Sequence, residues 1–276
     1  MRLWLLIENM WGNLFMDRSN FTNEVNFLID LLLSPEWPEA VPSFMICGDS
    51  EKDKAERAEG ILNFISEDLD NKKFCDFGCG EGHVVREVSK SSLFSVGYDI
   101  SSTGCLSWEK TEDNFLLTTN FDKIRENGPF DIILLYDVLD HVEFPDLVLQ
   151  NVFTLCSEKT KVFVRCHPWM SRHGGHLYSY INKAWVHLVF TEQELNQMGY
   201  CLPFLQKIYY PLGSYNSWFE NNKFKIIKQD TIKCGIEQFF HGKSIKNRLP
   251  LEKFNGNFPE SQMSQCYDDF ILGLKK

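Results

Sequence analysis

The sequence predicts an α/β fold built on a mostly parallel β-sheet, preceded by N-terminal helices. From Lys72 onward, short apolar runs alternate with segments of helical length, which is the pattern of βαβ units. The composition is that of a globular chain, since 43% of the 276 residues are hydrophobic and 24% are charged. Such a chain can bury a sizeable core, as one large domain or as one domain with a cap.

Two helices are expected before the first strand. Apolar residues recur at helical spacing over Thr22–Leu33, and Thr22 is a suitable N-cap. Ser50 and Asp53 form the pattern of a capping box and predict a second helix that runs to about Glu67. Three prolines lie between the two patterns and indicate a linker.

The alternating region divides into strands and helices. Strands are predicted at Lys73–Phe77, Phe94–Tyr98, Phe115–Thr118, Asp131–Tyr136 and Lys161–Arg165. Helices are predicted at Gly82–Lys90, Asp146–Ser157 and Ser214–Asn221, and after the capping box of Thr191 and Glu194. Two late strands, Phe224–Asp230 and Ser264–Leu272, are expected to add an antiparallel edge to the sheet.

Charge and cysteine content narrow the functional classes. The formal net charge of −10 argues against a surface that neutralises many phosphates, so a long nucleic acid is not expected as a partner. The nine cysteines show no paired C-x-x-C spacing, which indicates neither a disulfide framework nor a zinc ribbon. No apolar run has the length of a membrane span or a signal segment. We therefore expect a cytoplasmic protein with no membrane partner.

The most informative segment is Phe74-Cys75-Asp76-Phe77-Gly78-Cys79-Gly80-Glu81-Gly82-His83, where a predicted strand meets a helix. Glycines let the bare backbone of such a turn approach a ligand at the carboxyl end of the strand. Asp99 ends the second strand, 19 residues after Gly80, where a carboxylate can accept hydrogen bonds from both hydroxyls of a ribose. A nucleotide-type ligand is therefore predicted. The glycine spacing is G-x-G-x-G, which argues against a dinucleotide, whose fingerprint is G-x-G-x-x-G.

This pattern closely resembles motif I of the class I S-adenosylmethionine-dependent methyltransferases, and Asp99 falls where that family keeps its ribose-binding acid. Asn120 and Phe121 match the family's adenine position, and Phe130–Val142 looks like its fourth strand and the turn that follows. The resemblance implies a Rossmann-like sheet of seven mostly parallel strands with helices on both faces, and S-adenosylmethionine as cofactor. The cofactor-binding residues that it implies are Asp76, Gly78, Cys79, Gly80, Gly82, Asp99, Ile100, Asn120, Phe121 and Tyr136.

The same resemblance sets the domain boundaries that we expect. Residues 1–70 would form an N-terminal helical segment, and residues 71–276 would form the methyltransferase domain. Within this domain, a cap or insert is expected at about residues 166–220. The cap segment is rich in histidine and aromatic side chains, which suit the wall of a substrate site.

Three histidines are candidate catalytic bases. A sulfonium methyl group is already activated, so an enzyme mainly has to align the reactants and remove a proton from a hydroxyl or amine. His141 follows the family's fourth strand, His167 and His176 follow its fifth, and imidazole titrates near neutral pH. An alternative is that Asp137, Asp140 and His141 share a helical face and ligate a metal. This D-x-x-D-H set resembles the E-x-x-E-H motif of small-RNA 3′-end methyltransferases, but our prediction includes no metal.

The function that we expect is transfer of a methyl group to an oxygen or nitrogen atom of a small molecule or of a sugar in a glycan. Two alternatives are a metal-assisted RNA-end methyltransferase and a catalytically silent methyltransferase-like binding subunit. An oxidoreductase or epimerase on a dinucleotide-binding domain is disfavoured by the position of the third glycine. A homodimer is considered as the assembly.

Overall fold

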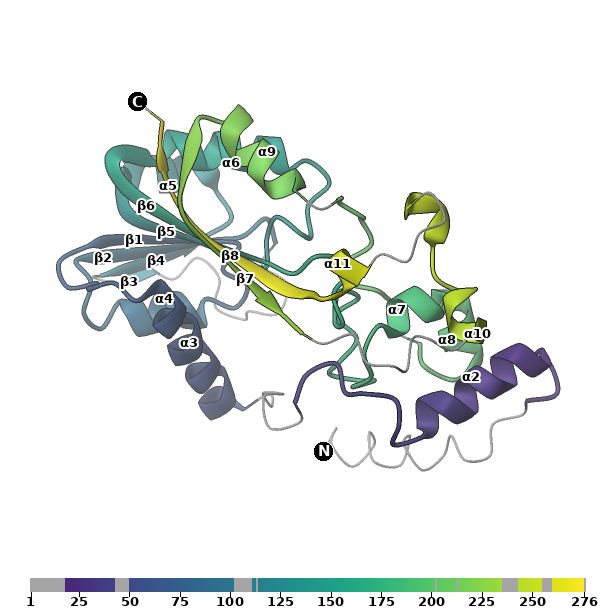
Figure 1. Cartoon of the computed structure of the whole chain (residues 1–276). Coiled ribbons are helices and arrows are strands. Elements are labelled where there is room, and N and C mark those ends of the chain that lie inside the picture. Colours follow the sequence, from purple (N-terminus) through teal and green to yellow (C-terminus); the bar gives the residue numbers. More distant parts are fainter. Residues whose placement is uncertain are drawn as a thin grey trace. The chain divides into compact units, whose positions relative to one another are not determined.

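The computed structural model describes residues 18–42, 50–101, 111–112, 114–201, 203–211, 213–234, 243–254 and 260–275. The chain divides into two compact units, each drawn from separate stretches of sequence (Figure 1). Unit 1 takes the described parts of Met1–Ile46, Trp169–Lys207 and Cys234–Gln265, and unit 2 takes those of Cys47–Pro168, Ile208–Lys233 and Cys266–Lys276. The boundary expected at residue 70 therefore falls inside unit 2. The expected cap contributes residues 169–207 to unit 1, while its remaining residues belong to unit 2.

Unit 2 is built on one sheet of eight strands in the order β3-β4-β2-β1-β5-β6-β8-β7. The strands are β1 (Lys73–Phe77), β2 (Phe94–Tyr98), β3 (Thr111–Glu112), β4 (Phe115–Thr118), β5 (Phe130–Tyr136), β6 (Cys156–Cys166), β7 (Phe224–Lys233) and β8 (Gln265–Leu274). Strands β4, β2, β1, β5 and β6 pair in parallel, whereas β8 is antiparallel to β6 and β3 is antiparallel to β4. The predicted sheet of seven mostly parallel strands is confirmed, and the two-residue β3 extends it at one edge.

Helices cover both faces of this sheet. They are α3 (Glu51–Ile65), α4 (His83–Val88), α5 (Phe121–Asn127), α6 (Pro145–Thr154) and α9 (Ser214–Asn221). Phe74 of β1 packs among residues of α3 and α4, while its neighbour Cys75 packs on the side of α5, α6 and α9. Because successive residues point to opposite faces and both faces are buried, the strands are almost continuously apolar. This explains why the sequence pattern reveals them.

Three helices end earlier than predicted, and one of them is α4, which was predicted to reach Lys90 and ends at Val88. Helix α3 ends at Ile65, because Ser66 adopts a left-handed conformation with a φ of 51°. The helix predicted to reach Ser157 ends at Thr154, since the chain enters β6 at Cys156, which pairs with β5. Strand β6 is accordingly longer than the predicted segment. The residues where α6 gives way to β6 fit both a helical and a strand pattern, so the end of α6 depends on the pairing of β6 with β5.

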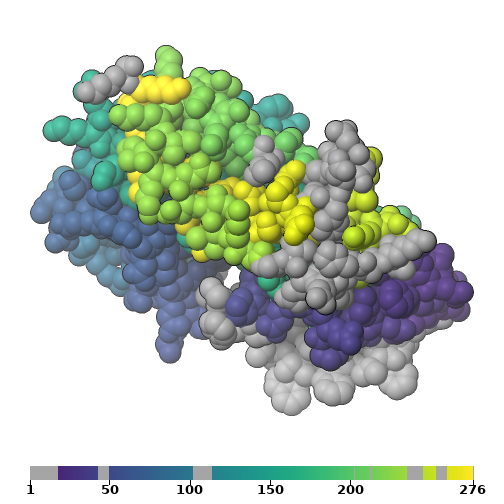
Figure 2. All heavy atoms as spheres, viewed as in Figure 1, coloured from purple at the N-terminus to yellow at the C-terminus, as the bar shows by residue number. Residues whose placement is uncertain are grey.

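The two late strands are present at the predicted edge of the sheet. Strand β8 runs antiparallel to β6 and places Asp269 opposite Arg165. Strand β7 is the last strand of the sheet, and its Ile227 is 55% exposed. Atoms of β7 lie on the face of the molecule drawn in Figure 2. Lysines recur along β7, and charged side chains at such an edge disfavour pairing with a further strand.

Unit 1 consists of short helices and loops. Its helical elements are α2 (Asn23–Leu33), α7 (Val186–Val189), α8 (Glu192–Gln197), α10 (Lys243–Lys246), η4 (Leu251–Phe254) and α11 (Glu260–Met263). The predicted N-caps Thr22 and Thr191 are formed, since each hydroxyl accepts a backbone N–H from the first turn of its helix. Trp37 is buried, and its Nε1 donates to the carbonyl of Ala184 at 2.8 Å. This bond ties two distant segments of the chain into one unit.

Across the described residues, no helix combines the length and the apolar character that crossing a membrane requires.

Candidate functional site

The turn after β1 bends in a way that glycine adopts with little strain. Gly78, Gly80 and Gly82 have φ angles of 91°, 52° and 76°, all in the left-handed region. A Cβ atom added at Gly78 would lie 2.5 Å from Cγ2 of Val138, so this position has no room for a side chain. A Cβ atom added at Gly80 would meet nothing within 4 Å. The turn therefore presents bare backbone to open space at Gly80.

Asp99 lies against this turn, as the sequence predicts. Its Oδ2 accepts the N–H of Gly80 at 3.0 Å, and its Oδ1 accepts the N–H of Ser101 at 3.2 Å. The parallel pairing of β1 with β2 brings the two strand ends together, and the carbonyl of Tyr98 accepts the first two N–H groups of the turn. Ile100 is 86% exposed. The glycine turn and the acid of the second strand thus form one local site.

Asp76 is a buried carboxyl group at the end of β1. It is 4% exposed, and burial together with the charge of Asp99 raises its pKa to about 7. Burial and the charges of the same two carboxyl groups also raise the pKa of the Cys79 thiol. A thiol with a raised pKa is a poor nucleophile at neutral pH. Asp76, in contrast, changes its charge within the physiological pH range.

Asn120 and Phe121 follow β4, next to the end of β2. Asn120 is the N-cap of α5, and its side-chain oxygen accepts the N–H of Asp122 at 2.9 Å. The ring of Phe121 packs on the rings of Phe77 and Tyr98, with centroids 6.4 and 5.9 Å apart. The predicted adenine residues therefore lie beside the ends of β1 and β2. The capping role of Asn120 leaves its amide nitrogen as the hydrogen-bond donor of that side chain.

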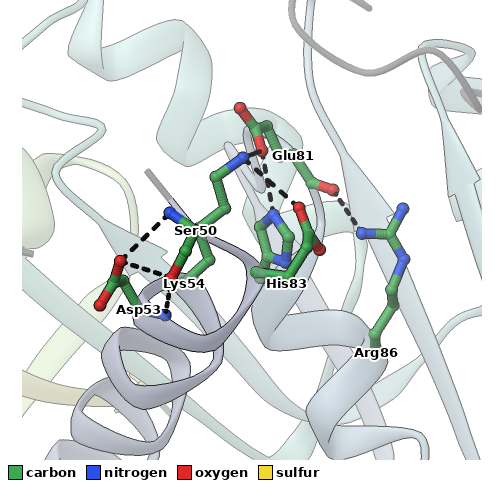
Figure 3. A network of polar contacts seen from close by, with 7 residues as sticks. Ser50, Asp53, Lys54, Glu81, His83 and Arg86 are labelled. Carbon is green, nitrogen blue, oxygen red and sulfur yellow. Dashed lines mark hydrogen bonds and ion pairs between the residues drawn. The ribbon is translucent and has the colours of Figure 1, made fainter. Parts of the chain in front are cut away.

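A polar network joins the glycine turn to α3 (Figure 3). Lys54 donates to Oε2 of Glu81 at 2.6 Å, Nε2 of His83 lies 2.9 Å from the same oxygen, and Arg86 donates to the Glu81 carbonyl at 3.1 Å. The hydrogen bonds from Lys54 and His83 lower the pKa of Glu81. We did not predict this network from the sequence, because Lys54 and Glu81 are 27 residues apart. The only sequence signal is the capping box at Ser50, which places Lys54 in the first turn of α3.

Tyr136, predicted as a cofactor residue, is held by a partly buried arginine. Its hydroxyl accepts a hydrogen bond from Arg165 at 3.0 Å. The Arg165 guanidinium also makes two 2.6 Å bonds to Asp269 and lies over the rings of Phe64 and Tyr267. The register of the sheet explains the cluster, since Arg165 stands beside Tyr136 on one neighbouring strand and opposite Asp269 on the other. Tyr136 therefore has a structural partner that the sequence does not reveal.

His167 and Asp137 meet at the carboxyl ends of β6 and β5. Nδ1 of His167 and Oδ1 of Asp137 are 2.5 Å apart, and their side chains are 12% and 17% exposed. The backbone N–H of His167 donates to Oδ2 of Asp140 at 3.1 Å. Burial disfavours the charged imidazole, but the carboxylates of Asp137 and Asp140 outweigh it and raise the pKa of His167. His141 lies on the same turn, with its Nε2 3.9 Å from Oδ2 of Asp140.

The D-x-x-D-H segment is a turn and not the helix that the metal alternative assumes. Asp137 has a φ of 56°, in the left-handed region, and the N–H of His141 donates to the carbonyl of Val138 at 3.0 Å. Helix α6 begins only at Pro145. Asp137, Asp140 and His141 therefore do not share a helical face, and that expectation was wrong. The reason is the left-handed residue at the strand end, which redirects the chain.

His176 belongs to unit 1, whereas His141 and His167 belong to unit 2. Within unit 1, His176 has a φ of 53°, and its N–H donates to the carbonyl of His173 at 2.8 Å. Its ring centroid lies 6.2 Å from that of Tyr178. The three candidate bases thus come from different units, and only two of them share a unit with the glycine turn.

His187 is a buried histidine of the histidine-rich segment expected to form the substrate cap, and it was not among the predicted catalytic bases. It is 6% exposed, its Nε2 lies 2.6 Å from the carbonyl of Trp169, and burial lowers its pKa to about 4. It lines a pocket of about 830 Å³ inside unit 1, together with Trp169, Phe190, Phe204 and Arg248 among others. His187 is therefore neutral at physiological pH and packs as a core residue.

Comparisons with known proteins identify the family of this fold and site. A family model described as a methyltransferase domain matches residues 51–229, which is more than half of the chain. The chain belongs to this family of methyltransferase domains. The resemblance to class I S-adenosylmethionine-dependent methyltransferases is thereby confirmed, and with it the enzyme class and S-adenosylmethionine as the cofactor.

This methyltransferase is similar to solved structures of low sequence identity. A SAM-dependent methyltransferase from Archaeoglobus fulgidus is 13% identical, with a TM-score of 0.50 over 80% of this chain and 94% of that chain. The plantazolicin methyltransferase BamL, solved with a triazolic desmethylPZN analog and SAH, is 14% identical, with a TM-score of 0.47 over 98% of both chains. Magnesium protoporphyrin IX methyltransferase from Synechocystis PCC 6803, solved with SAH, is 12% identical, with a TM-score of 0.45 over 83% of this chain and 89% of that chain. No curated protein matches the sequence.

Proposed function

We propose that this methyltransferase transfers a methyl group from S-adenosylmethionine to an oxygen or nitrogen atom of a small molecule or sugar. The observation that carries the proposal is the turn after β1, where Gly80 faces open space and Asp99 Oδ2 lies 3.0 Å from the Gly80 nitrogen. Bare backbone with a carboxylate beside it fits a nucleoside that carries ribose hydroxyls and a polar tail. The residues at this edge of the sheet thus fit the cofactor.

The residues around the turn would hold the cofactor. Gly78, Gly80 and Gly82 would approach its methionine part, and Asp99 would accept hydrogen bonds from the ribose hydroxyls. When bound, S-adenosylmethionine supplies a methyl group that its positively charged sulfur activates. The proposed set is completed by Asp76, Cys79, Ile100, Asn120, Phe121 and Tyr136.

A small acceptor suits the charge of the chain. The formal net charge of −10 disfavours a long polyanion such as RNA, because like charges repel. A hydroxyl or amine acceptor loses a proton during methylation, and His141, His167 and His176 are the candidate bases. A cytoplasmic location and a homodimer stay predictions from the sequence.

Calorimetric titration tests the cofactor site directly. S-adenosylmethionine and its demethylated product would be titrated into the wild type and into the Asp99→Ala variant. Loss of a charged hydrogen-bonding group is worth about 1.5–3 kcal/mol, so we expect affinity to fall roughly 10- to 150-fold. Asp122→Ala on α5 is the matched control, because this carboxylate is exposed and pairs only locally with Arg125. Equal affinity of wild type and Asp99→Ala would refute the assignment of the ribose-binding acid.

Methyl transfer itself needs an acceptor screen. The wild type would be incubated with methyl-labelled S-adenosylmethionine and a panel of small molecules and sugars that carry hydroxyl or amine groups. Label on a panel member is the expected result. Tight cofactor binding without any transfer would favour a silent binding subunit, and transfer only to an RNA end with Mg²⁺ or Mn²⁺ would favour the RNA alternative.

A further inference from the structure

Asp137 and His167 form a close, mostly buried ion pair. Oδ1 of Asp137 and Nδ1 of His167 are 2.5 Å apart. The ring of Tyr267 on β8 approaches the imidazole edge-on, with centroids 5.7 Å apart. An imidazole whose Nδ1 carries the proton toward a carboxylate keeps its basic lone pair on Nε2. Asp137 and Tyr267 therefore contact the imidazole from two elements and restrict the position of its ring.

Asp137 reaches this position with a strained backbone. Its φ of 56° lies in the left-handed region, which residues other than glycine adopt less readily. The conformation is held because the N–H of Asp137 donates to the carbonyl of Arg165 at 3.1 Å, which extends the pairing of β5 with β6. A glycine would adopt this turn more easily. What aspartate adds at the position is its carboxylate, which contacts His167.

His167 is anchored from its other side. Its backbone N–H donates to Asp140, a side chain with no exposed surface, at 3.1 Å. Two residues earlier on the same strand, Arg165 is fixed by its two bonds to Asp269. The strand end that carries the imidazole therefore has little freedom. A rigid frame of this kind keeps a catalytic group in its reactive geometry.

The pair lies beside the glycine turn. Val138 follows Asp137 directly, and its Cγ2 would be 2.5 Å from a Cβ atom added at Gly78. Strand β5 stands between β1 and β6, and all three are parallel, so their carboxyl ends share one edge of the sheet. In open α/β sheets, ligands bind at this edge. The imidazole and the proposed cofactor turn thus belong to one site within unit 2.

We infer that His167 is the catalytic base of this methyltransferase and that Asp137 is its positioning residue. The inference rests on the proposed function, because a base is needed only if the acceptor is a hydroxyl or amine. As the acceptor atom bonds to the methyl carbon, the carbon–sulfur bond breaks and its electron pair stays on sulfur. The acceptor proton passes to Nε2 of His167 and later leaves to solvent.

The first test measures the pair without any acceptor or cofactor. Imidazole signals are followed by NMR as a function of pH, and the signal of His167 is the one absent from His167→Gln. The charged and titratable groups around His167 are Asp137, Asp140, Arg165 and Tyr267. Asp137→Asn removes the closest charge, so we expect the pKa of His167 to fall by at least about one unit. An unchanged pKa would overturn the inference.

Two further variants keep this test sound. Asp137→Gly suits the left-handed backbone and also removes the carboxylate, so it should fold and lower the pKa of His167 in the same way. Glu126→Gln on α5 changes an exposed carboxylate and should leave that pKa as it is in the wild type. A pKa that falls in Glu126→Gln as much as in the Asp137 variants would show a general charge effect and contradict a specific pair.

The second test measures methyl transfer to an acceptor from the panel. We expect His167→Gln to lower kcat roughly hundredfold or more, with KM and cofactor affinity nearly unchanged. Asp137→Asn should lower kcat less and shift its pH dependence to lower pH, while Glu126→Gln should match the wild type. Wild-type kcat in His167→Gln would overturn the inference alone and leave the proposed function standing. A wild type that binds cofactor but methylates nothing would instead refute the proposed function together with the base.

Discussion

Asp76 offers the most quantitative test of how burial acts on the glycine turn. Its pKa is raised from 3.8 to about 7 in the folded chain, so the native state holds a proton that the unfolded chain releases. Each pKa unit corresponds to about 1.4 kcal/mol. The stability that this proton gives is fully present below pH 3.8 and is lost as pH rises to 7. Between pH 5 and pH 8, the free energy of unfolding should therefore fall by about 3 kcal/mol through this group alone.

Asp76→Asn removes the titration and keeps the shape of the side chain. Urea unfolding of both proteins at pH 5 and pH 8, without cofactor, gives the difference in their free energies of unfolding at each pH. Other titrating groups cancel in this comparison. The free energy of unfolding of Asp76→Asn should therefore rise by about 3 kcal/mol relative to that of the wild type between pH 5 and pH 8. Asp122→Asn, an exposed carboxylate, should show no such gain. If the Asp76→Asn difference is the same at both pH values, the carboxyl group is not held protonated by burial and the reasoning fails.

Three further predictions concern the turn, the arginine cluster and the buried histidine. Gly80→Ala should fold with a small loss of stability from its left-handed φ, and it should bind the cofactor more weakly in calorimetric titration, because its methyl group enters the open space at the turn. Gly78→Ala should lose more stability to thermal unfolding, because its methyl group also has no room. Arg165→Met should cost about 3–5 kcal/mol in urea unfolding, since it leaves the Asp269 carboxylate partly buried and unpaired, and the double variant with Asp269→Leu should be milder. His187→Gln should make the protein less sensitive to acid. In the wild type, the stability that neutral His187 contributes is lost as pH falls from 6.5 to about 4. If the free energy of unfolding depends on pH in the same way in the wild type and in His187→Gln, this prediction is wrong.

The glycine turn, its acid and the strands could be predicted from the sequence because their signals are local. Gly78, Gly80 and Gly82 mark a backbone that adopts left-handed conformations, and the apolar runs around Cys75 mark strands buried on both faces. Asp99 could be placed at the turn because parallel neighbours bring their carboxyl ends together. Capping boxes likewise fixed the starts of two helices. In each case, the physical cause acts within a few residues or one strand pairing.

Contacts between distant residues were decided only by the tertiary structure. Lys54 meets Glu81 because α3 packs beside α4, and Arg165 meets Asp269, 104 residues away, because of the register of β6 with β8. No local pattern encodes such a register. The helical face expected for Asp137, Asp140 and His141 failed for the same reason, since spacing alone assumes a helix, whereas the φ of Asp137 is set by its bond to the neighbouring strand. The sequence by itself thus determined the sheet, the glycine turn and the family, because their signals are local, while long-range packing decided which side chains face one another.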